Sequence, residues 1–541
     1  MKRNYLTRIL MLTIIILFAV SAFGCKKKNT ASDDDNTLEV YLWNAGYGYE
    51  WLEKLLEDFG TLDWVQEKYP NYSYFTVIND DNSYGANRLA AGKGNTIDLI
   101  LSGDLDAYFA TDQLVEISEC ILESMVPGEN IKFKDKMLPS VYQSLGFTPY
   151  GDTKTYYNTV PWNLGVGGII YNATLFDELG LNVPRTTDEM FEIMDTVKEW
   201  NASKAIYPYT YSYIASQITY CEYILPQWWA QYDGVENYEN FSFAIDEEGV
   251  KNSINVLYEQ GRLKSWEILD RLLDEANGYY DRSSPNRDFI TGQSYLLLRR
   301  GLFMFSGDWF SNEMKDLAEG YKSEGYTDIM SMMKTPIVSS LIEKLSTIND
   351  DATLCQVIDE IDNGKTTSSV AGVSQADFDR VREARGVMYT NNGNCHSVIP
   401  SYSTAKELAI DFVRYMATDR ANELFAYYSA GGKLPYKYDF KTQSPEKYAE
   451  LNATQSSTLY LQTKVSEYLQ TPYTRILSNR ISDFARYGGF NVLAGSNTSD
   501  IFGTFVYSRT SAFDLYQNAI DYYTKNDNAM WNTALRNAGM L

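Results

Sequence analysis

The stretch Leu38-Glu39-Val40-Tyr41-Leu42-Trp43 is the first of several short apolar runs that alternate with helical segments along the chain. A helical stretch follows over about 49–68, and two more strand candidates lie at 74–78 and 97–101. Strands that alternate with helices are typical of α/β proteins, in which helices cover a parallel sheet. The sequence therefore predicts an α/β fold that begins near residue 38.

The same alternation resumes after Pro161. Residues 168–171 and 302–305 have the composition of buried strands, and the second of these runs is flanked by glycines. From about residue 448 the pattern is mostly helical to residue 541. A chain of 541 residues is long for one domain and comfortable for two large lobes.

Two helix starts are predicted from capping boxes. Thr186 and Glu189 have the required spacing before an amphipathic segment, and Thr404 and Glu407 repeat it. Residues 339–388 have the pattern of a charged helix pair inserted into the fold.

The N-terminus has the pattern of an export signal. Three basic residues begin the chain, and an apolar run over 9–23 is too short to span a bilayer comfortably. The Ala-Phe-Gly-Cys at 22–25 resembles a bacterial lipobox, in which the signal is cut before the cysteine and that cysteine carries lipid such as palmitate. We expect a lipoprotein signal peptide at 1–24, lipidation of Cys25, a flexible tether at 25–36, and a chain held at the extracellular face of the cell membrane. A plain N-terminal membrane anchor is the alternative.

The composition excludes several classes of function. A net charge of −24 repels phosphate backbones, so nucleic-acid binding is not expected. No second apolar run reaches about 18 residues, so neither a pore nor a permease is expected. The 44 tyrosines combine an apolar ring face with a polar tip, which suits hydroxyl-rich ligands.

Metal and redox sites are not expected either. His396 is the one histidine of the sequence, which makes a multi-histidine metal site implausible. The cysteines beyond the N-terminus have no C-x-x-C spacing, so they suggest no zinc or redox motif. No cofactor is predicted, and disulfide formation stays open for Cys120, Cys221, Cys355 and Cys395.

Three stretches of sequence follow one another in a recognisable order. They begin at Pro161-Trp162-Asn163 and run to Glu189, then span Arg300 to Trp309, and finally run from Ile399 to Gly431-Gly432-Lys433-Leu434-Pro435. Over roughly residues 37–436 this order resembles the family 1 extracellular solute-binding proteins, the lipoprotein receptors of carbohydrate ABC importers. The resemblance is to the subgroup from Gram-positive bacteria.

This resemblance implies a periplasmic-binding-protein-like fold. Two α/β lobes, each a mostly parallel sheet flanked by helices, would close on a ligand in the cleft between them, and ABC permease subunits would read that closure. By analogy, lobe one is 37–157 plus 335–433, and lobe two is 158–334 plus 434–541. A monomer is expected.

Candidate ligand-binding residues follow from a rule for open α/β sheets, in which ligands lie at the carboxyl ends of strands. In the family these loops face the cleft. Aromatic rings there would stack on a sugar, and Asp104 and Asp308 would accept hydrogen bonds from its hydroxyls. The predicted ligand-binding residues are Trp43, Asn44, Tyr47, Ser102, Asp104, Trp162, Asn163, Trp228, Asp308, Trp309 and His396.

The favoured interpretation is therefore a lipid-anchored receptor, not an enzyme, that binds a sugar or oligosaccharide and delivers it to an ABC importer. Three alternatives stay open. They are a binding protein for another solute such as a peptide, a surface adhesin or sensor without a transporter, and an extracellular glycoside hydrolase. The last would need two carboxylates that face each other across a sugar.

Overall fold

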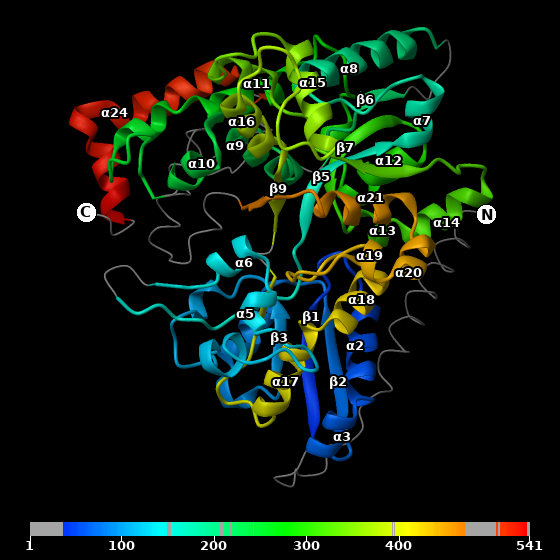
Figure 1. Ribbon diagram of the computed structural model, residues 1–541, viewed down its shortest axis with the longest axis vertical. Helices are drawn as coiled ribbons and strands as arrows, with labels where there is room; N and C mark the ends of the chain where they lie inside the picture. Colours follow the sequence, from blue (N-terminus) through cyan, green and yellow to red (C-terminus); the bar gives the residue numbers. More distant parts are fainter. Residues whose placement is uncertain are drawn as a thin grey trace, which may run out of the picture.

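The computed structural model describes residues 36–148, 153–204, 210–216, 218–241, 243–391, 393, 395–470, 505–506, 509–537 and 541. The expected signal peptide at 1–24, Cys25 and most of the tether lie outside these residues. Two β-sheets form the centres of two lobes, which lie one above the other in Figure 1. The predicted two-lobed α/β architecture is confirmed. The expectation of mostly parallel sheets is wrong, because strands that return from the other lobe pair antiparallel in both sheets.

Lobe one is built on a five-stranded sheet of order β2-β1-β3-β10-β4. Strand β1 (Thr37–Trp43) lies parallel to β2 (Ser73–Asn79) and to β3 (Leu99–Ser102), as the alternation predicts. Strand β10 (His396–Val398) runs antiparallel to β3 and to β4 (Val160–Pro161). Parallel pairing places the carboxyl ends of β1 and β3 at the same edge of the sheet.

Lobe two is built on a six-stranded sheet, in which β5 (Val166–Asn172) has the most neighbours. This strand pairs antiparallel with three others, β7 (Gly301–Gly307), β8 (Met330–Met333) and β9 (Val387–Thr390). The chain enters lobe two through β5 and returns to lobe one after β9, so these two strands run in opposite directions. The two edge strands are parallel to their neighbours, β6 (Tyr211–Tyr213) to β7 and β11 (Glu467–Leu469) to β9.

Helices surround both sheets (Figure 1). Those of lobe one are α2 (Glu50–Gly60), α3 (Asp63–Lys68), α4 (Ser83–Ala90), α5 (Phe133–Lys136), α6 (Pro139–Gln143), α17 (Lys406–Met416) and α18 (Asp419–Tyr428). Those of lobe two are α7 (Ala173–Glu178), α8 (Thr187–Ala202), α9 (Leu225–Asp233), α10 (Val235–Phe241), α11 (Gln260–Leu273), α12 (Phe289–Leu297), α13 (Phe310–Glu313), α14 (Lys315–Ser323), α15 (Asp351–Asp362), α16 (Gln375–Arg385) and α24 (Ala512–Asn537). Three short helices lie between the lobes, namely α19 (Phe440–Gln443), α20 (Pro445–Glu450) and α21 (Ala453–Gln462). Among the residues described above, no helix combines the length and the apolar character that crossing a membrane requires.

The chain crosses between the lobes three times, and the crossing segments are hydrogen-bonded to one another. The first joins β4 to β5, the second joins β9 to β10, and the third follows α18. The amide of Trp162 donates to the carbonyl of Cys395 at 2.8 Å, and the amide of Leu164 donates to the carbonyl of Lys433 at 2.8 Å. The three crossings therefore form one narrow connection, which is the place where a hinge can act.

The structure divides the chain between the lobes at different points from those predicted. We expected 335–433 in lobe one, but β9 pairs within the sheet of lobe two. The insertion at 339–388 forms α15 and α16 as a helix pair, and α16 packs on α9 of lobe two. Only from β10 onward does the chain rejoin lobe one, because that is where strand pairing changes sheet.

The capping boxes form only in part. Thr186 Oγ1 accepts from the amide of Glu189 at 3.3 Å, as predicted. The carboxylate of Glu189 accepts from the amide of Arg185 instead of closing the box. The second predicted box is wrong, since α17 begins at Lys406 after Ala405. The amide of Ala405, which takes the N-cap position, donates to Ser403 Oγ and Asp98 Oδ1.

Candidate functional site

Five of the predicted ligand residues meet between the two lobes. These are Tyr47, Trp162, Asn163, Asp308 and Trp309, here called the interlobe cluster, and none exposes more than 6% of its surface. The ring of Tyr47 lies edge-on to the rings of Trp162 at 6.0 Å and Trp309 at 6.3 Å. Its hydroxyl donates to Asp308 Oδ1 at 2.5 Å. The cluster therefore joins the loop after β1 in lobe one to the end of β7 in lobe two.

Glycines allow these side chains to approach one another. A Cβ atom at Gly307 would lie 2.2 Å from the indole of Trp309, so a larger residue would displace that ring. A Cβ atom at Gly165 would lie 3.4 Å from the Tyr47 hydroxyl, which shows how closely the first crossing passes the cluster. Gly46 has φ +83°, a conformation that glycine adopts without strain and that turns the chain just before Tyr47.

Burial dominates the electrostatics of the cluster. It raises the pKa of Asp308 to about 7, although the Tyr47 hydroxyl and three backbone amides oppose this shift by stabilising the carboxylate. Burial, followed by the proximity of Asp308, raises the pKa of Tyr47 well above its usual value. The Tyr47 hydroxyl therefore stays protonated and is the donor of this pair.

Several buried polar atoms of the cluster lack a hydrogen-bond partner. Asp308 Oδ2, Trp162 Nε1 and both side-chain atoms of Asn163 are in this state. The Asn163 amide lies close to the Tyr47 hydroxyl, but without the geometry of a hydrogen bond. Buried polar groups without partners cost about 1–3 kcal/mol each. A ligand that carries several hydroxyl groups could satisfy both the donors and the acceptors.

A second contact between the lobes lies beside the cluster and was not predicted. Asn312 Nδ2 in α13 donates to the carbonyl of Gly46 at 2.8 Å. The next residue, Glu313, accepts from Gln293 Nε2 at 2.6 Å, and burial raises its pKa to about 7. Asn312 and Glu313 follow Trp309 by three and four residues, so helical spacing could have indicated that they share its side of the chain.

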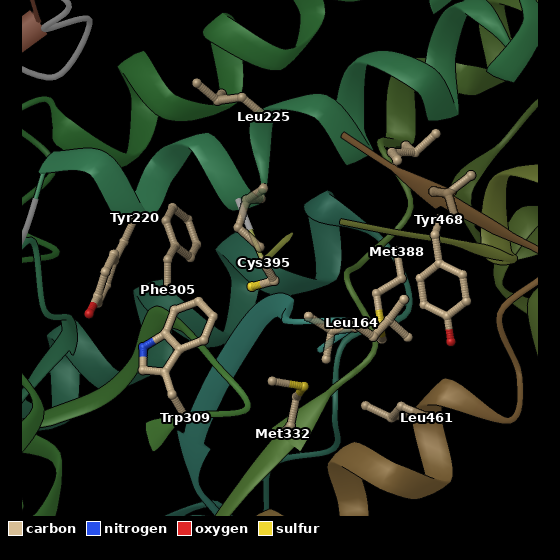
Figure 2. Close-up of a cluster of buried hydrophobic side chains, with 14 of the residues drawn as sticks. Leu164, Tyr220, Leu225, Phe305, Trp309, Met332, Met388, Cys395, Leu461 and Tyr468 are labelled. Atoms are coloured by element: carbon tan, nitrogen blue, oxygen red, sulfur yellow. The ribbon is translucent and has the colours of Figure 1, made fainter. Parts of the chain in front are cut away.

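Tyrosines surround Trp309, and they too were not among the predicted site residues. Tyr223 lies edge-on to the indole at 5.2 Å, and Tyr220 lies at 6.1 Å. Tyr389 of β9 packs on Tyr223 at 5.0 Å. Figure 2 shows Trp309 beside Phe305 and Tyr220 within the buried cluster of lobe two. In this arrangement the indole packs against protein, so stacking on a sugar would require the lobes to separate.

Three other predicted residues lie in lobe one without a described contact to the cluster. Trp43 is half-buried at the end of β1, where it packs on the lobe-one core. Asn44 donates through Nδ2 to Asp80 Oδ1 at 3.0 Å. The side chain of Asp104 is exposed and its backbone has φ +50°.

Ser102, His396 and Trp228 are buried elsewhere in their lobes. Ser102 donates to the carbonyl of Asn82 at 3.0 Å, on the α4 side of the sheet. His396 lies opposite Ser102 in the sheet, with Nδ1 3.3 Å from Thr159 Oγ1 and its ring edge-on to Phe109. Trp228 donates to the carbonyl of Pro336 at 3.2 Å inside lobe two. These three side chains therefore pack within their own lobes, and their ligand role stays a prediction.

In the part of the chain that the structure describes, we find neither a cluster of metal-binding side chains nor an activated thiol at the hinge. No group of His, Cys, Asp and Glu residues there has an arrangement that could hold a metal ion. Of the four cysteines whose pairing was left open, Cys120, Cys355 and Cys395 are free thiols. Burial raises the pKa of Cys395, which lies at the second crossing, so that thiol is not activated.

No protein-family model matches the chain, and no curated protein matches its sequence. Solved structures do match its fold. A chitin oligosaccharide binding protein is 13% identical with a TM-score of 0.55, and 92% of this chain covers 99% of that one. A maltose-bound protein of T. maritima is 15% identical with a TM-score of 0.54, over 90% of this chain and 98% of that one.

The apo form of the solute-binding protein RafE from Streptococcus pneumoniae is 13% identical with a TM-score of 0.54. That match covers 92% of this chain and 97% of the other. At these identities the likeness shows the fold, which is the two-lobed fold of periplasmic binding proteins, as predicted.

The raised pKa of Asp308 makes stability depend on pH in a defined direction. Between about pH 4, where an unfolded aspartate titrates, and about pH 7, the folded state retains a proton that the unfolded state has lost. The free energy of unfolding therefore falls as the pH rises through this window, by up to about 1.4 kcal/mol per pH unit. We expect Asp308→Asn, which keeps the acceptor for Tyr47, to remove this part of the fall.

Urea unfolding at about pH 5 and about pH 7 measures the effect, and the difference between variant and parent separates Asp308 from Glu313, which titrates in the same window. The control is Asp316→Asn on the exposed face of α14. Equal pH dependence in Asp308→Asn and the parent chain would contradict the assignment.

Proposed function

We propose that this chain is a receptor that binds a sugar or oligosaccharide between its lobes and is not an enzyme. The observation that carries the proposal is the interlobe cluster, in which aromatic rings and unpartnered buried polar atoms from both lobes lie at a three-segment hinge. The solved structures of the same fold include proteins described as bound to maltose and as binding chitin oligosaccharide.

The chemistry of the cluster suits a pyranose. Once the lobes separate, the ring face of Trp309 offers an apolar platform for a C–H-rich face of a sugar, whereas Trp162 stacks on Trp51 at 5.4 Å and supplies its indole N–H. Asp308 would accept from a hydroxyl group, and hydrogen bonds to charged groups contribute about 1.5–3 kcal/mol. Asn163 offers both a donor and an acceptor.

Ligand entry requires the Tyr47–Asp308 hydrogen bond to open. A sugar hydroxyl that donates to Asp308 then takes the place of the Tyr47 hydroxyl, which becomes available to the ligand. A sugar favours closure only to the extent that it binds the closed form, with both lobes around it, more tightly than the open form. This exchange gives the receptor a closed form that permease subunits could recognise.

The cellular context of the proposal comes from the N-terminal sequence. The basic start, the apolar run and Cys25 favour a lipid-anchored protein at the extracellular face of the membrane. Delivery of the bound sugar to an ABC importer fits that position, and no nucleic acid or cofactor is involved. A peptide-binding receptor and a glycoside hydrolase are the competing functions, and Asp308 has Tyr47 rather than a second carboxyl group as its partner.

A ligand panel tests the proposal. Thermal unfolding of the full chain, in a detergent without a sugar headgroup, is followed with mono- and oligosaccharides and with peptides. A sugar at 100 times its dissociation constant should add about 2.7 kcal/mol to stability. Trp309→Phe should weaken binding, whereas Trp266→Phe, which alters a buried tryptophan of α11 away from the cluster, should lower stability without changing affinity.

Two outcomes would overturn the assignment. A shift with peptides alone would replace the sugar by a peptide while leaving a receptor. Hydrolysis of an oligosaccharide or aryl glycoside during the same incubations would make the protein an enzyme.

The lipid anchor is tested separately. Cells that express the chain are grown with labelled palmitate, and we expect label on the parent chain and on Cys120→Ala, the control at a partly exposed cysteine. Cys25→Ala should carry no label. Label that persists in Cys25→Ala would contradict the proposed anchor.

A further inference from the structure

Glu313 carries a carboxylate on the side of lobe two that faces lobe one. A Cβ atom at Gly46 would lie 2.8 Å from Glu313 Oε1 and 3.1 Å from Trp309 Cβ, so the carboxylate meets the loop that carries Tyr47. The amide of Glu313 donates to the carbonyl of Trp309 at 3.0 Å, which holds this side chain one turn beyond the indole. The carboxylate and the interlobe cluster therefore belong to one surface between the lobes.

No cation compensates this carboxylate. Among the residues that the structure describes, neither a lysine nor an arginine pairs with Glu313, and its donor is the neutral amide of Gln293, which bonds Oε2. Oε1 is left without a partner. The side chain is only half-buried, so it is not sealed inside lobe two. An uncompensated carboxylate at an interface that opens is a place where a ligand can supply the missing charge.

The neighbouring amide side chains present further acceptors without donors. Gln293 is fully buried, and the bond from its Nε2 to Glu313 leaves Gln293 Oε1 without a partner. Asn312 uses its Nδ2 for the carbonyl of Gly46, and no described donor reaches its Oδ1. The surroundings of the carboxylate are therefore rich in acceptors, whereas the unpartnered atoms of the interlobe cluster include both donors and acceptors.

Aromatic rings lie beside the carboxylate. Trp309 precedes Glu313 by one helical turn, and the ring of Tyr220 lies 6.1 Å from the indole. Burial, and then the nearby charge of Glu313, raise the pKa of Tyr220, so this ring is also close to the carboxylate. Tryptophan and tyrosine rings attract cations. An ammonium group has three donors and no acceptor, and it therefore suits these surroundings.

We propose that the ligand of this receptor is an amino sugar, whose ammonium group pairs with Glu313 Oε1 when the lobes close. The inference rests on the sugar receptor proposed above and names its ligand class. A sugar hydroxyl would donate one hydrogen bond but leave the negative charge uncompensated, whereas an ammonium group supplies both. Separation of the lobes, which sugar entry already requires, moves Gly46 away from Oε1. The net charge of −24 also attracts a cationic ligand.

Calorimetric titration of the full chain with matched sugars tests the ligand class. Glucosamine, galactosamine and the glucosamine trisaccharide of chitosan are each compared with the sugar that has hydroxyl groups in place of the amines, and with the N-acetylated form. The titrations are made near neutral pH, in a detergent without a sugar headgroup. We expect at least one amine to bind about tenfold or more tightly than both of its uncharged counterparts.

Two variants test the contact with the carboxylate. Glu313→Gln keeps the acceptor for Gln293 and removes the charge, so the preference for the amine should fall about tenfold or more. Glu324→Gln removes the same charge from an exposed position just after α14 and should leave the preference unchanged. This pair separates a local contact from the general attraction of an acidic chain for cations.

The outcomes distinguish this inference from the proposed function. Equal affinity of every amine and its uncharged counterparts would overturn the amino-sugar ligand and leave the sugar receptor in place. An equal preference in Glu313→Gln and Glu324→Gln would overturn the contact with Glu313. Binding of none of these sugars would overturn the inference, and the ligand panel decides the receptor separately.

A cooperative thermal transition of each variant confirms that it is folded. Should Glu313→Gln fail that check, Glu313→Asp takes its place, because it withdraws the carboxylate by one methylene group and should also weaken the preference. The comparison of amine with N-acetylated sugar on the parent chain needs no variant.

Discussion

The hydrogen bond from the Tyr47 hydroxyl to Asp308 is the contact on which the arrangement of the two lobes depends. It joins residues 261 positions apart, from the end of a strand in each sheet, at a place closed to water. If the Tyr47 hydroxyl moved away, the buried carboxyl group of Asp308 would keep only backbone amides as donors. The lobes can therefore separate at low cost only when another good donor takes the place of that hydroxyl. In the receptor proposed above, a hydroxyl group of the ligand would be that donor.

Much of the fold follows from local patterns, because strand and helix periods are visible in one sequence. The strands predicted near 38–43, 74–78, 97–101 and 302–305 all form, with ends shifted by a few residues. The division between lobes was not visible in that way. Strand β9 joins the second sheet through long-range pairing with β5, which no local signal encodes. The cap expected at Thr404 does not form, because the helix begins one residue later, with Ala405 at its N-cap.

The prediction of the site succeeded where the strand-end rule selected loops that also meet between the lobes. The loops after β1 and β7 do bring Tyr47, Asp308 and Trp309 together. The rule says which end of a strand matters but not which way a side chain turns, so it also selected Ser102, which faces α4, and Asp104, which is exposed. Asn312 was missed because its importance comes from packing across the lobes, and a single sequence does not show which segments meet there.

The distance between the lobes, with and without sugar, is the most direct test of this account. Spin labels at Glu67→Cys on α3 and Glu319→Cys on α14, both exposed, report on lobe one and lobe two, with Cys120 replaced by Ser. Pulsed electron resonance should find a longer-distance population in the free protein, in which Tyr47 has left Asp308, and a saturating oligosaccharide should remove it. An unchanged distribution in the presence of a sugar that demonstrably binds would contradict hinge closure around the interlobe cluster.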